Sequence, residues 1–248
     1  LMGDRTKALE YQERVLSMRE RIYGEEHPEV AGALSMLAWV YREQGDLDQA
    51  LVYEERTLEM RLRIYGEEHP DVAGALQDVA DVHQAKGDLT KALEYRERVL
   101  SMRERIYGEE HPEVASSLAA IAGVHQAKGD LTNALEYRER VLSMRERIYG
   151  EEHPDVAGSL SAIGRVYKDL GELDRALEYQ VRYLEMVQRI YGDEHPMVVD
   201  ALVGVGNVHQ SKGDLVKALE YRELALAMNQ RIYGEEHPDV AGSLSAIG

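Results

Sequence analysis

Apolar residues recur along the chain at helical spacing, in stripes that alternate between two kinds of segment. One stripe lies between residues 70 and 86 and consists of Val72, Leu76, Val79, Ala80 and His83. The next lies between residues 89 and 107 and consists of Ala92, Leu93, Val99, Leu100 and Ile106. Because both sets fit the period of an α-helix, the pattern predicts two amphipathic helices of roughly 16 to 19 residues.

Turn-forming residues mark the ends of these two helices. Pro70 is expected in the first turn, where its missing N–H costs nothing, and Asp71 follows where negative charge suits the helix dipole. His69 falls at or next to the N-cap. Gly87-Asp88 combines a glycine that ends one helix with an aspartate that caps the next, and Gly108 ends the second helix.

The helix pair recurs with a fixed period of 42 residues. The octapeptide Arg-Ile-Tyr-Gly-Glu-Glu-His-Pro, with one Glu→Asp change in the copy at Arg189, begins at Arg21, Arg63, Arg105, Arg147, Arg189 and Arg231. A period of this size indicates stacked units that bury their apolar faces against one another. We expect one elongated all-α domain over residues 1–248, in which each repeat contains a first-type helix and then a second-type helix. Its expected parts are a second-type helix at 4–24, repeat units at 27–66, 69–108, 111–150, 153–192 and 195–234, and a truncated first-type helix at 237–248.

The repeat resembles the tetratricopeptide repeat. The resemblance rests on Leu34, Leu37, Ala38 and Tyr41 in a first-type helix, on Gly45-Asp46, and on Ala50, Leu51 and Tyr53 in the second. The length and the Tyr-Gly-Glu-Glu-His-Pro connector are similar to the 42-residue variety of kinesin light chains and of the sensor parts of signalling proteins. The resemblance implies a right-handed superhelical solenoid of antiparallel helix pairs, with the outward stripe of each first-type helix lining a concave groove.

Comparison between repeats locates a candidate site in this groove. Residues 89–110 and 131–152, a second-type helix with its connector, differ at one position of 22, whereas 111–130 and 153–172 differ at 10 of 20. The variation concentrates where first-type side chains should face the groove, and the candidate ligand-binding residues are Ser35, Trp39, Arg42, Gln77, Asp81, Gln84, Gln126, Ser161, Arg165, Lys168, Asn207 and Gln210. Aromatic residues and arginine commonly anchor interfaces. The alternative is that solvent-facing positions drifted after duplication.

Each of these residues has an expected role in binding an extended protein segment. Trp39 would be an apolar anchor, Asp81 and Gln77 polar readers, and Arg165 with Lys168 groups that bind acids. This pattern predicts a protein-interaction scaffold, the recognition or regulatory arm of a larger signalling protein. There are three alternatives: an array that assembles head to tail, an enzyme whose catalytic part lies outside these residues, and an engineered array.

Several motifs that resemble chemical sites have a structural interpretation. The Glu-Glu-His of the connector could hold zinc or manganese, but consecutive residues in one turn rarely converge on one ion, so a capping turn is favoured. His83 shares a repeat position with Tyr41, which indicates a packed ring rather than a catalytic base. The Arg-Glu-Arg runs are interpreted as a solvated, paired face. Every candidate constellation repeats for structural reasons, so no catalytic residue, cofactor or metal is expected.

Charge and composition narrow the class of partner. A net charge of −17 disfavours nucleic acid and anionic membranes, because binding to phosphates needs clustered Lys and Arg. The chain has no cysteine and no long apolar segment, which suits a cytoplasmic protein. Leu9, Val15, Leu16 and Ile22 of the opening helix are expected to face nothing, so we expect a piece of a longer array whose exposed end helices could associate head to tail.

Overall fold

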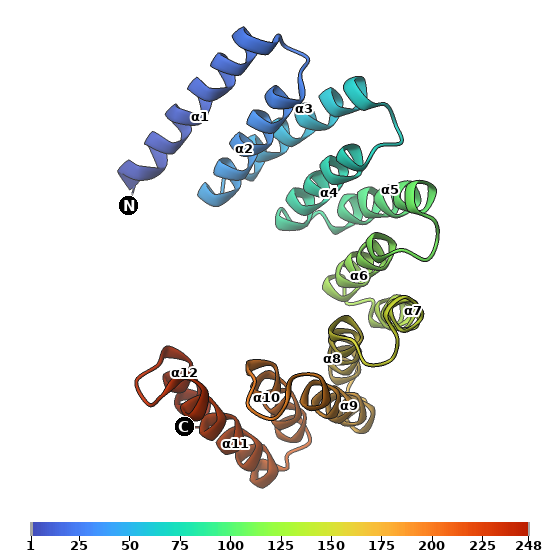
Figure 1. Ribbon diagram of the computed structural model, residues 1–248, viewed down its shortest axis with the longest axis vertical. Helices are drawn as coiled ribbons and strands as arrows, with labels where there is room; N and C mark the ends of the chain where they lie inside the picture. The colour runs from blue at the N-terminus through green and yellow to red at the C-terminus, as the bar shows by residue number, and fades with distance from the viewer. Residues whose placement is uncertain (1, 248) are drawn as a thin grey trace. The chain divides into compact units, whose positions relative to one another are not determined.

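The computed structural model describes residues 2–247, and every regular element among them is an α-helix (Figure 1). First-type and second-type helices alternate, with lengths close to those expected from the pattern. The helices are α1 (Met2–Tyr23), α2 (Pro28–Gln44), α3 (Leu47–Tyr65), α4 (Pro70–Ala85), α5 (Leu89–Tyr107), α6 (Pro112–Ala127), α7 (Leu131–Tyr149), α8 (Pro154–Asp169), α9 (Leu173–Tyr191), α10 (Pro196–Ser211), α11 (Leu215–Tyr233) and α12 (Pro238–Ile247). None of the helices described is both long enough and apolar enough to cross a membrane.

The connector before each first-type helix is a capping turn. His69 is the N-cap of α4, as predicted, and its Nδ1 accepts a hydrogen bond of 3.1 Å from the backbone N–H of Asp71. The imidazole stacks on Tyr65, with ring centroids 4.2 Å apart. The glutamate before the histidine reaches the following repeat, since Glu68 Oε1 accepts from Arg105 Nε at 2.9 Å. The Glu-Glu-His motif therefore caps one helix and ties two repeats together.

The turn within a repeat is built from a glycine and a capping aspartate. Gly87 has a φ of +80°, which other residues rarely adopt, and Asp88 Oδ1 accepts from the backbone N–H of Lys91 at 3.2 Å. Asp46, Asp130 and Asp214 cap α3, α7 and α11 in the same way. Glu172, the N-cap of α9, makes no such bond because its side chain is one methylene longer.

Replacing Glu172 with aspartate is expected to stabilise the protein by about 0.5–1 kcal/mol, since it supplies the N-cap hydrogen bond that α9 lacks. Chemical denaturation followed by circular dichroism would measure the change. The matched control is Asp88→Glu, which should destabilise α5 by a similar amount. Equal stability of all three proteins would contradict this account of the turn.

The described chain forms two compact units, unit 1 up to Lys128 and unit 2 from Gly129. In each unit a second-type helix packs against the first-type helix of its own repeat and against the one that follows: α3 contacts α2 and α4, and α9 contacts α8 and α10. The predicted stripe of α4 is buried in full, and its Val72, Leu76 and Val79 join Val99 of α5 in the core of unit 1. The expectation of a single array stays a prediction.

Helix α1 presents several apolar side chains to solvent. Val15 and Ile22 are exposed, as expected, together with Tyr11 and Met18. Leu9 and Leu16 differ from the expectation, because both are half-buried, and Leu16 packs against the cluster that contains Val30 and Leu34 of α2. One face of α1 is therefore packed, and only the opposite face is open.

Candidate functional site

The second-type helices supply a row of side chains that face the first-type helices. This inner row consists of the residues at one repeat position in α3, α5, α7, α9 and α11, namely Glu54, Arg96, Arg138, Gln180 and Arg222. Its members are turned inward: Glu54 is 5% exposed and Gln180 3% exposed, while Arg96 pairs with α4 and Arg222 donates to the carbonyl of Ala246 on α12. The inner row also varies between repeats, since Glu54 and Gln180 stand where the other three members are arginines.

In unit 1, an arginine of the inner row forms hydrogen bonds with residues that are predicted to bind a ligand. Arg96 Nη2 donates to Asp81 Oδ1 at 2.7 Å and to Gln84 Oε1 at 2.9 Å. Two turns further along α5, Arg103 Nη2 donates to Gln77 Oε1 at 3.1 Å. Asp81, Gln84 and Gln77 are thus hydrogen-bonded within their own chain, and a ligand would compete with these bonds.

These contacts correct the interpretation of the Arg-Glu-Arg runs as a solvated face. The side chains of Arg96 and Arg103 are both only 12% exposed. Arg145, which occupies the position of Arg103 in the next repeat, donates to Ser159 Oγ at 3.0 Å and to the carbonyl of Asp155. The first arginine of each run lies against a first-type helix, because residues three and four apart on a helix share a face and here that face is buried.

In unit 2 the same pairing recurs with different residues. Arg222 Nη2 donates to Gln210 Oε1 at 2.6 Å and, at the long distance of 3.5 Å, to Asn207 Oδ1. Gln210 and Asn207 correspond to Gln84 and Asp81 in the repeat register. An arginine of the inner row is accompanied by acceptors on the first-type helix in both units.

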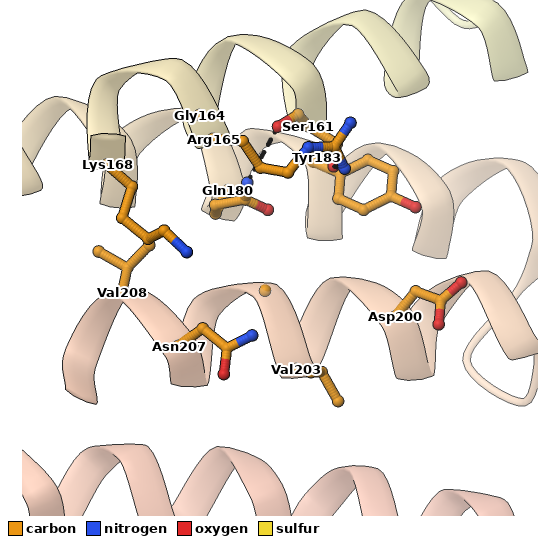
Figure 2. Close-up of a pocket in the computed structure, with 11 residues that line it drawn as sticks. Ser161, Gly164, Arg165, Lys168, Gln180, Tyr183, Asp200, Val203, Asn207 and Val208 are labelled. Carbon is orange, nitrogen blue, oxygen red and sulfur yellow. Dashed lines mark hydrogen bonds between the residues drawn. The ribbon is translucent and has the colours of Figure 1, made fainter. Parts of the chain in front are cut away.

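A pocket of about 280 Å³ lies between α8, α9 and α10 of unit 2 (Figure 2). Four predicted site residues come together in its wall: Ser161, Arg165, Lys168 and Asn207. The wall also contains residues that the sequence analysis did not single out, namely Gly164, Gln180, Tyr183, Asp200, Val203, Gly204 and Val208. Comparison of second-type helices at the inner-row position would have found Gln180, where neighbouring repeats carry arginine.

Two glycines hold the amide of Gln180 in this pocket. Gln180 Nε2 donates to the carbonyl of Ser161 at 3.1 Å. A Cβ on Gly164 would lie 2.7 Å from Gln180 Nε2, and a Cβ on Gly204 would lie 2.6 Å from Gln180 Oε1. Since real Cβ atoms do not approach other atoms so closely, the amide can occupy this place only between glycines.

The pocket contains two cationic side chains that form no ion pair with the one acidic residue in its wall, Asp200. No ion pair joins Arg165 or Lys168 to a carboxylate among the residues that the structure describes. Arg165 Nη1 makes a single long bond of 3.3 Å to Ser161 Oγ. Burial, and then the charges of Arg165 and Arg145, lower the pKa of Arg138 on the adjoining helix α7. Such surplus charge favours an anionic group in the pocket.

Polar groups of a different kind line the opposite end of the pocket. In Figure 2, Lys168 and Val208 mark one end and Asp200 the other. Burial raises the pKa of Asp200. Burial also raises the pKa of the Tyr183 phenol, and the negative charge of Asp200 raises it further. The carboxyl of Asp200 and the phenol of Tyr183 can accept or donate a hydrogen bond, whereas the ammonium of Lys168 at the other end can only donate.

The remaining predicted residues lie in unit 1. Trp39 of α2 is exposed over 49% of its surface, as the anchor role requires, and Ser35 and Arg42 on the same helix are half-buried. Gln126 is half-buried on α6. These residues line no pocket comparable to that of unit 2 among those described.

The histidines within first-type helices are packed rings. His83 is buried and stacks on Tyr95 with centroids 5.5 Å apart, as Tyr41 stacks on Tyr53. Burial lowers the pKa of His83, so the ring is favoured in its neutral form. No group of three potential metal ligands occurs among the described residues.

The sequence matches the family model of the tetratricopeptide repeat over residues 1–63, 71–125, 117–189 and 160–220. The chain belongs to the tetratricopeptide repeat family. This agrees with the paired helices, the buried stripes and the inner row described above. The matching family is one of repeat scaffolds, and the match indicates no enzyme family. A search of curated protein sequences found no match.

Solved structures share the fold of this tetratricopeptide repeat protein. BtubC (BKLC) from P. vanneervenii superposes with a TM-score of 0.76 at 20% identity and covers 94% of each chain. A putative kinesin light chain from Podosopora anserina with nearly identical repeats has a TM-score of 0.71 at 24% identity, over 84% of this chain and 99% of that one. A Rap protein complexed with Competence and Sporulation Factor has a TM-score of 0.64 at 15% identity, over 95% and 66%. At these identities the likeness concerns the fold.

Proposed function

We propose that this tetratricopeptide repeat protein is an interaction scaffold that binds an extended protein segment along its first-type helices. In unit 2 the pocket between α8, α9 and α10 would take an acidic side chain of that segment. The proposal includes a role as the recognition or regulatory arm of a larger, cytoplasmic signalling protein, with no catalysis by these repeats. Its partner is a protein, and neither nucleic acid nor membrane is part of the proposal.

The observation that carries this proposal is the unpaired positive charge in a preformed pocket. Arg165 and Lys168 lie in the wall of a cavity large enough for one side chain, and neither forms an ion pair in the described part of the chain. Charge-assisted hydrogen bonds to a carboxylate are stronger than those between neutral groups. A Rap protein of the same fold has been crystallised with a bound factor, which supports binding by such a fold.

The contacts of the inner row argue that the variation between repeats is not simple drift. Where the inner row carries Arg96 or Arg222, the first-type helix carries acceptors. Where the first-type helix carries Arg165 and Lys168, the second-type helix of the same repeat carries the neutral Gln180, although Arg138 of the preceding second-type helix lies near Arg165. Side chains that vary together keep the interior compatible, and the residues left without a partner remain available for a ligand.

A display screen of random peptides against the intact chain would test the proposal. We expect enrichment of Asp and Glu, and we expect Arg165→Ala and Lys168→Ala each to weaken binding of the selected peptides by about tenfold. Trp39→Ala should weaken binding of those peptides that also contact unit 1. None of these changes should alter the helical content or the melting temperature.

The matched control is Arg182→Ala. Arg182 is exposed on α9, outside the pocket, where it lies over the ring of Tyr179. Arg182→Ala removes one positive charge, as Arg165→Ala does. A general electrostatic attraction to acidic peptides would therefore be weakened equally by the two variants. The proposal would be overturned if Arg182→Ala reduced binding as much as Arg165→Ala, or if the screen selected no acidic residues.

Self-association is the second candidate function, and the open apolar face of α1 favours it. Tyr11, Met18 and Ile22 are each more than half exposed on this helix. Exposed apolar surface at the end of a repeat array can stack on a second copy and produce open assemblies. Light scattering over a wide concentration range distinguishes the two candidates, because growth of the particle mass with concentration would favour assembly.

A further inference from the structure

Unit 1 contains a pair of carboxyl groups that its own chain does not neutralise. Glu54 on α3 is almost completely buried, and its Oε2 is enclosed without a hydrogen-bond partner. Asp78 on α4 is half-buried and close enough to Glu54 to raise its pKa. A buried carboxylate without a partner is costly.

The other members of the inner row show how this position is satisfied elsewhere. Arg96 pairs with Asp81 and Gln84, and Gln180 donates to the carbonyl of Ser161. Glu54 has neither arrangement. Glu54 faces Asp78 on the first-type helix. At the same repeat position in unit 2, the residue next to Gln180 is Gly204, which has no charge.

The charged groups around the pair come from α3 itself and from the helices packed on it. Arg42 of α2 and Arg61 of α3 both lower the pKa of Glu54 and of Asp78, whereas Asp81 of α4 raises the pKa of both. Arg61 is engaged elsewhere, since its Nη1 donates to the carbonyl of Asp71 at 3.0 Å. Asp81 is paired with Arg96 of α5. No ion pair connects Arg42 or Arg61 to Glu54 or Asp78 in the described part of the chain.

We propose that Glu54 and Asp78 form a binding site in unit 1 for a cationic side chain of the partner segment, with a guanidinium as the best fit. A guanidinium presents several N–H donors in one plane and can bond to two carboxylates at once. Trp39 and Met36 are exposed on the adjacent helix α2, at the repeat positions of Asp81 and Asp78. An aromatic and apolar surface there suits the flat face and the alkyl chain of an arginine.

Binding of a cation at this place has a protonation signature. Burial, and then the charge of Asp78, raise the pKa of Glu54 to about 8, so the carboxyl is mostly protonated at neutral pH. A guanidinium would bind the ionised form and displace the proton. Its affinity is therefore expected to rise with pH, by up to about tenfold per pH unit below pH 8.

The test uses a small probe and the intact chain, so it does not depend on finding the natural partner. Nα-acetyl-arginine amide would be titrated while the side-chain carboxyl carbons are followed by NMR, with Nα-acetyl-citrulline amide as the uncharged isostere and Nα-acetyl-lysine amide as the ammonium. We expect the arginine probe to lower the pKa of Glu54 by about one unit or more at saturation, and the citrulline probe to leave it unchanged. A larger shift with lysine than with arginine would overturn the preference for a guanidinium.

Variants separate this site from other acidic surface. Glu54→Gln and Asp78→Asn should each weaken arginine binding at least tenfold, whereas Glu55→Gln, a change of equal charge on the exposed side of α3, should not. Binding of the arginine probe to Glu54→Gln with unchanged affinity would overturn the proposal. The inference rests on the proposed function only in assuming that the partner is a protein segment. The two proposals can therefore fail separately: peptides whose binding depends on Arg165 but not on Glu54 would refute the site at Glu54 alone.

Discussion

Glu54→Gln is expected to stabilise the protein at pH 9 by several kcal/mol and to have little effect at pH 4. The pKa of Glu54 is raised to about 8 in the folded chain, chiefly by burial, whereas in the unfolded chain the side chain titrates near its ordinary value of about 4.3. Between these values the folded state binds the proton and the unfolded state does not. The contribution of Glu54 to stability is therefore complete below about pH 4 and is lost as the pH rises to 8.

The glutamine variant has the same shape and cannot ionise, so it escapes this loss. Each unit of pKa shift corresponds to about 1.4 kcal/mol, and coupling to Asp78 reduces what a single substitution recovers. Thermal melting of wild type, Glu54→Gln and the exposed control Glu55→Gln at pH 5, 7 and 9 would measure the effect as a difference between variants. A difference that did not grow with pH would contradict the burial of an ionisable Glu54.

Gly204→Ala is expected to destabilise the protein by about 1–3 kcal/mol, although alanine favours helices more than glycine does. The added Cβ would lie 2.6 Å from Gln180 Oε1, so the amide must move. Gln180 is 3% exposed and donates to the carbonyl of Ser161, and a displaced amide would lose that bond inside the protein. The pocket would also become smaller.

The matched control is Gly158→Ala in α8, where the added Cβ would meet no atom within 4 Å. This variant should be stabilised by about 0.5–1 kcal/mol through helix propensity alone. Removing the amide should rescue the clash, so that Gly204→Ala in a Gln180→Ala background costs clearly less than in the wild type. A double-mutant cycle by chemical denaturation measures this coupling, and a coupling near zero would contradict the close approach.

The fold could be predicted from the sequence because every repeat carries the same capping residues and the same apolar stripes. Pro70, Gly87 and Asp88 each sit where only a few residue types are favourable, and a stripe such as Val72, Leu76 and Val79 has one way to be buried. The exceptions have local causes. Leu16 of α1 is half-buried because α2 provides a partner on one of its sides.

The site could be predicted only in part, since the sequence shows which positions vary and not which of them are already occupied. Arg165, Lys168, Ser161 and Asn207 are all among the predicted groove residues and lie together in the wall of one pocket, and their role in binding stays a prediction. Asp81 and Gln77 vary in the same way, yet Arg96 and Arg103 already bond to them. The Arg-Glu-Arg pattern alone predicts a solvated, paired face. It does not show that the side chain of Arg96 reaches Asp81 on the preceding helix, because that direction depends on residues elsewhere in the chain.

The pairing of Arg96 with Asp81 and of Arg222 with Gln210 has a consequence for how such arrays diversify. Both partners lie within one block of 42 residues, on α4 and α5 or on α10 and α11. Duplication or exchange of a complete block transfers the cation together with its acceptors. An exchange that joined the first-type helix of Arg165 and Lys168 to a second-type helix carrying arginine would instead add a further cation to a place where Arg138 of α7 already lies near Arg165. Inheritance by whole blocks therefore keeps each of these arginines together with its acceptors while new surfaces are shuffled.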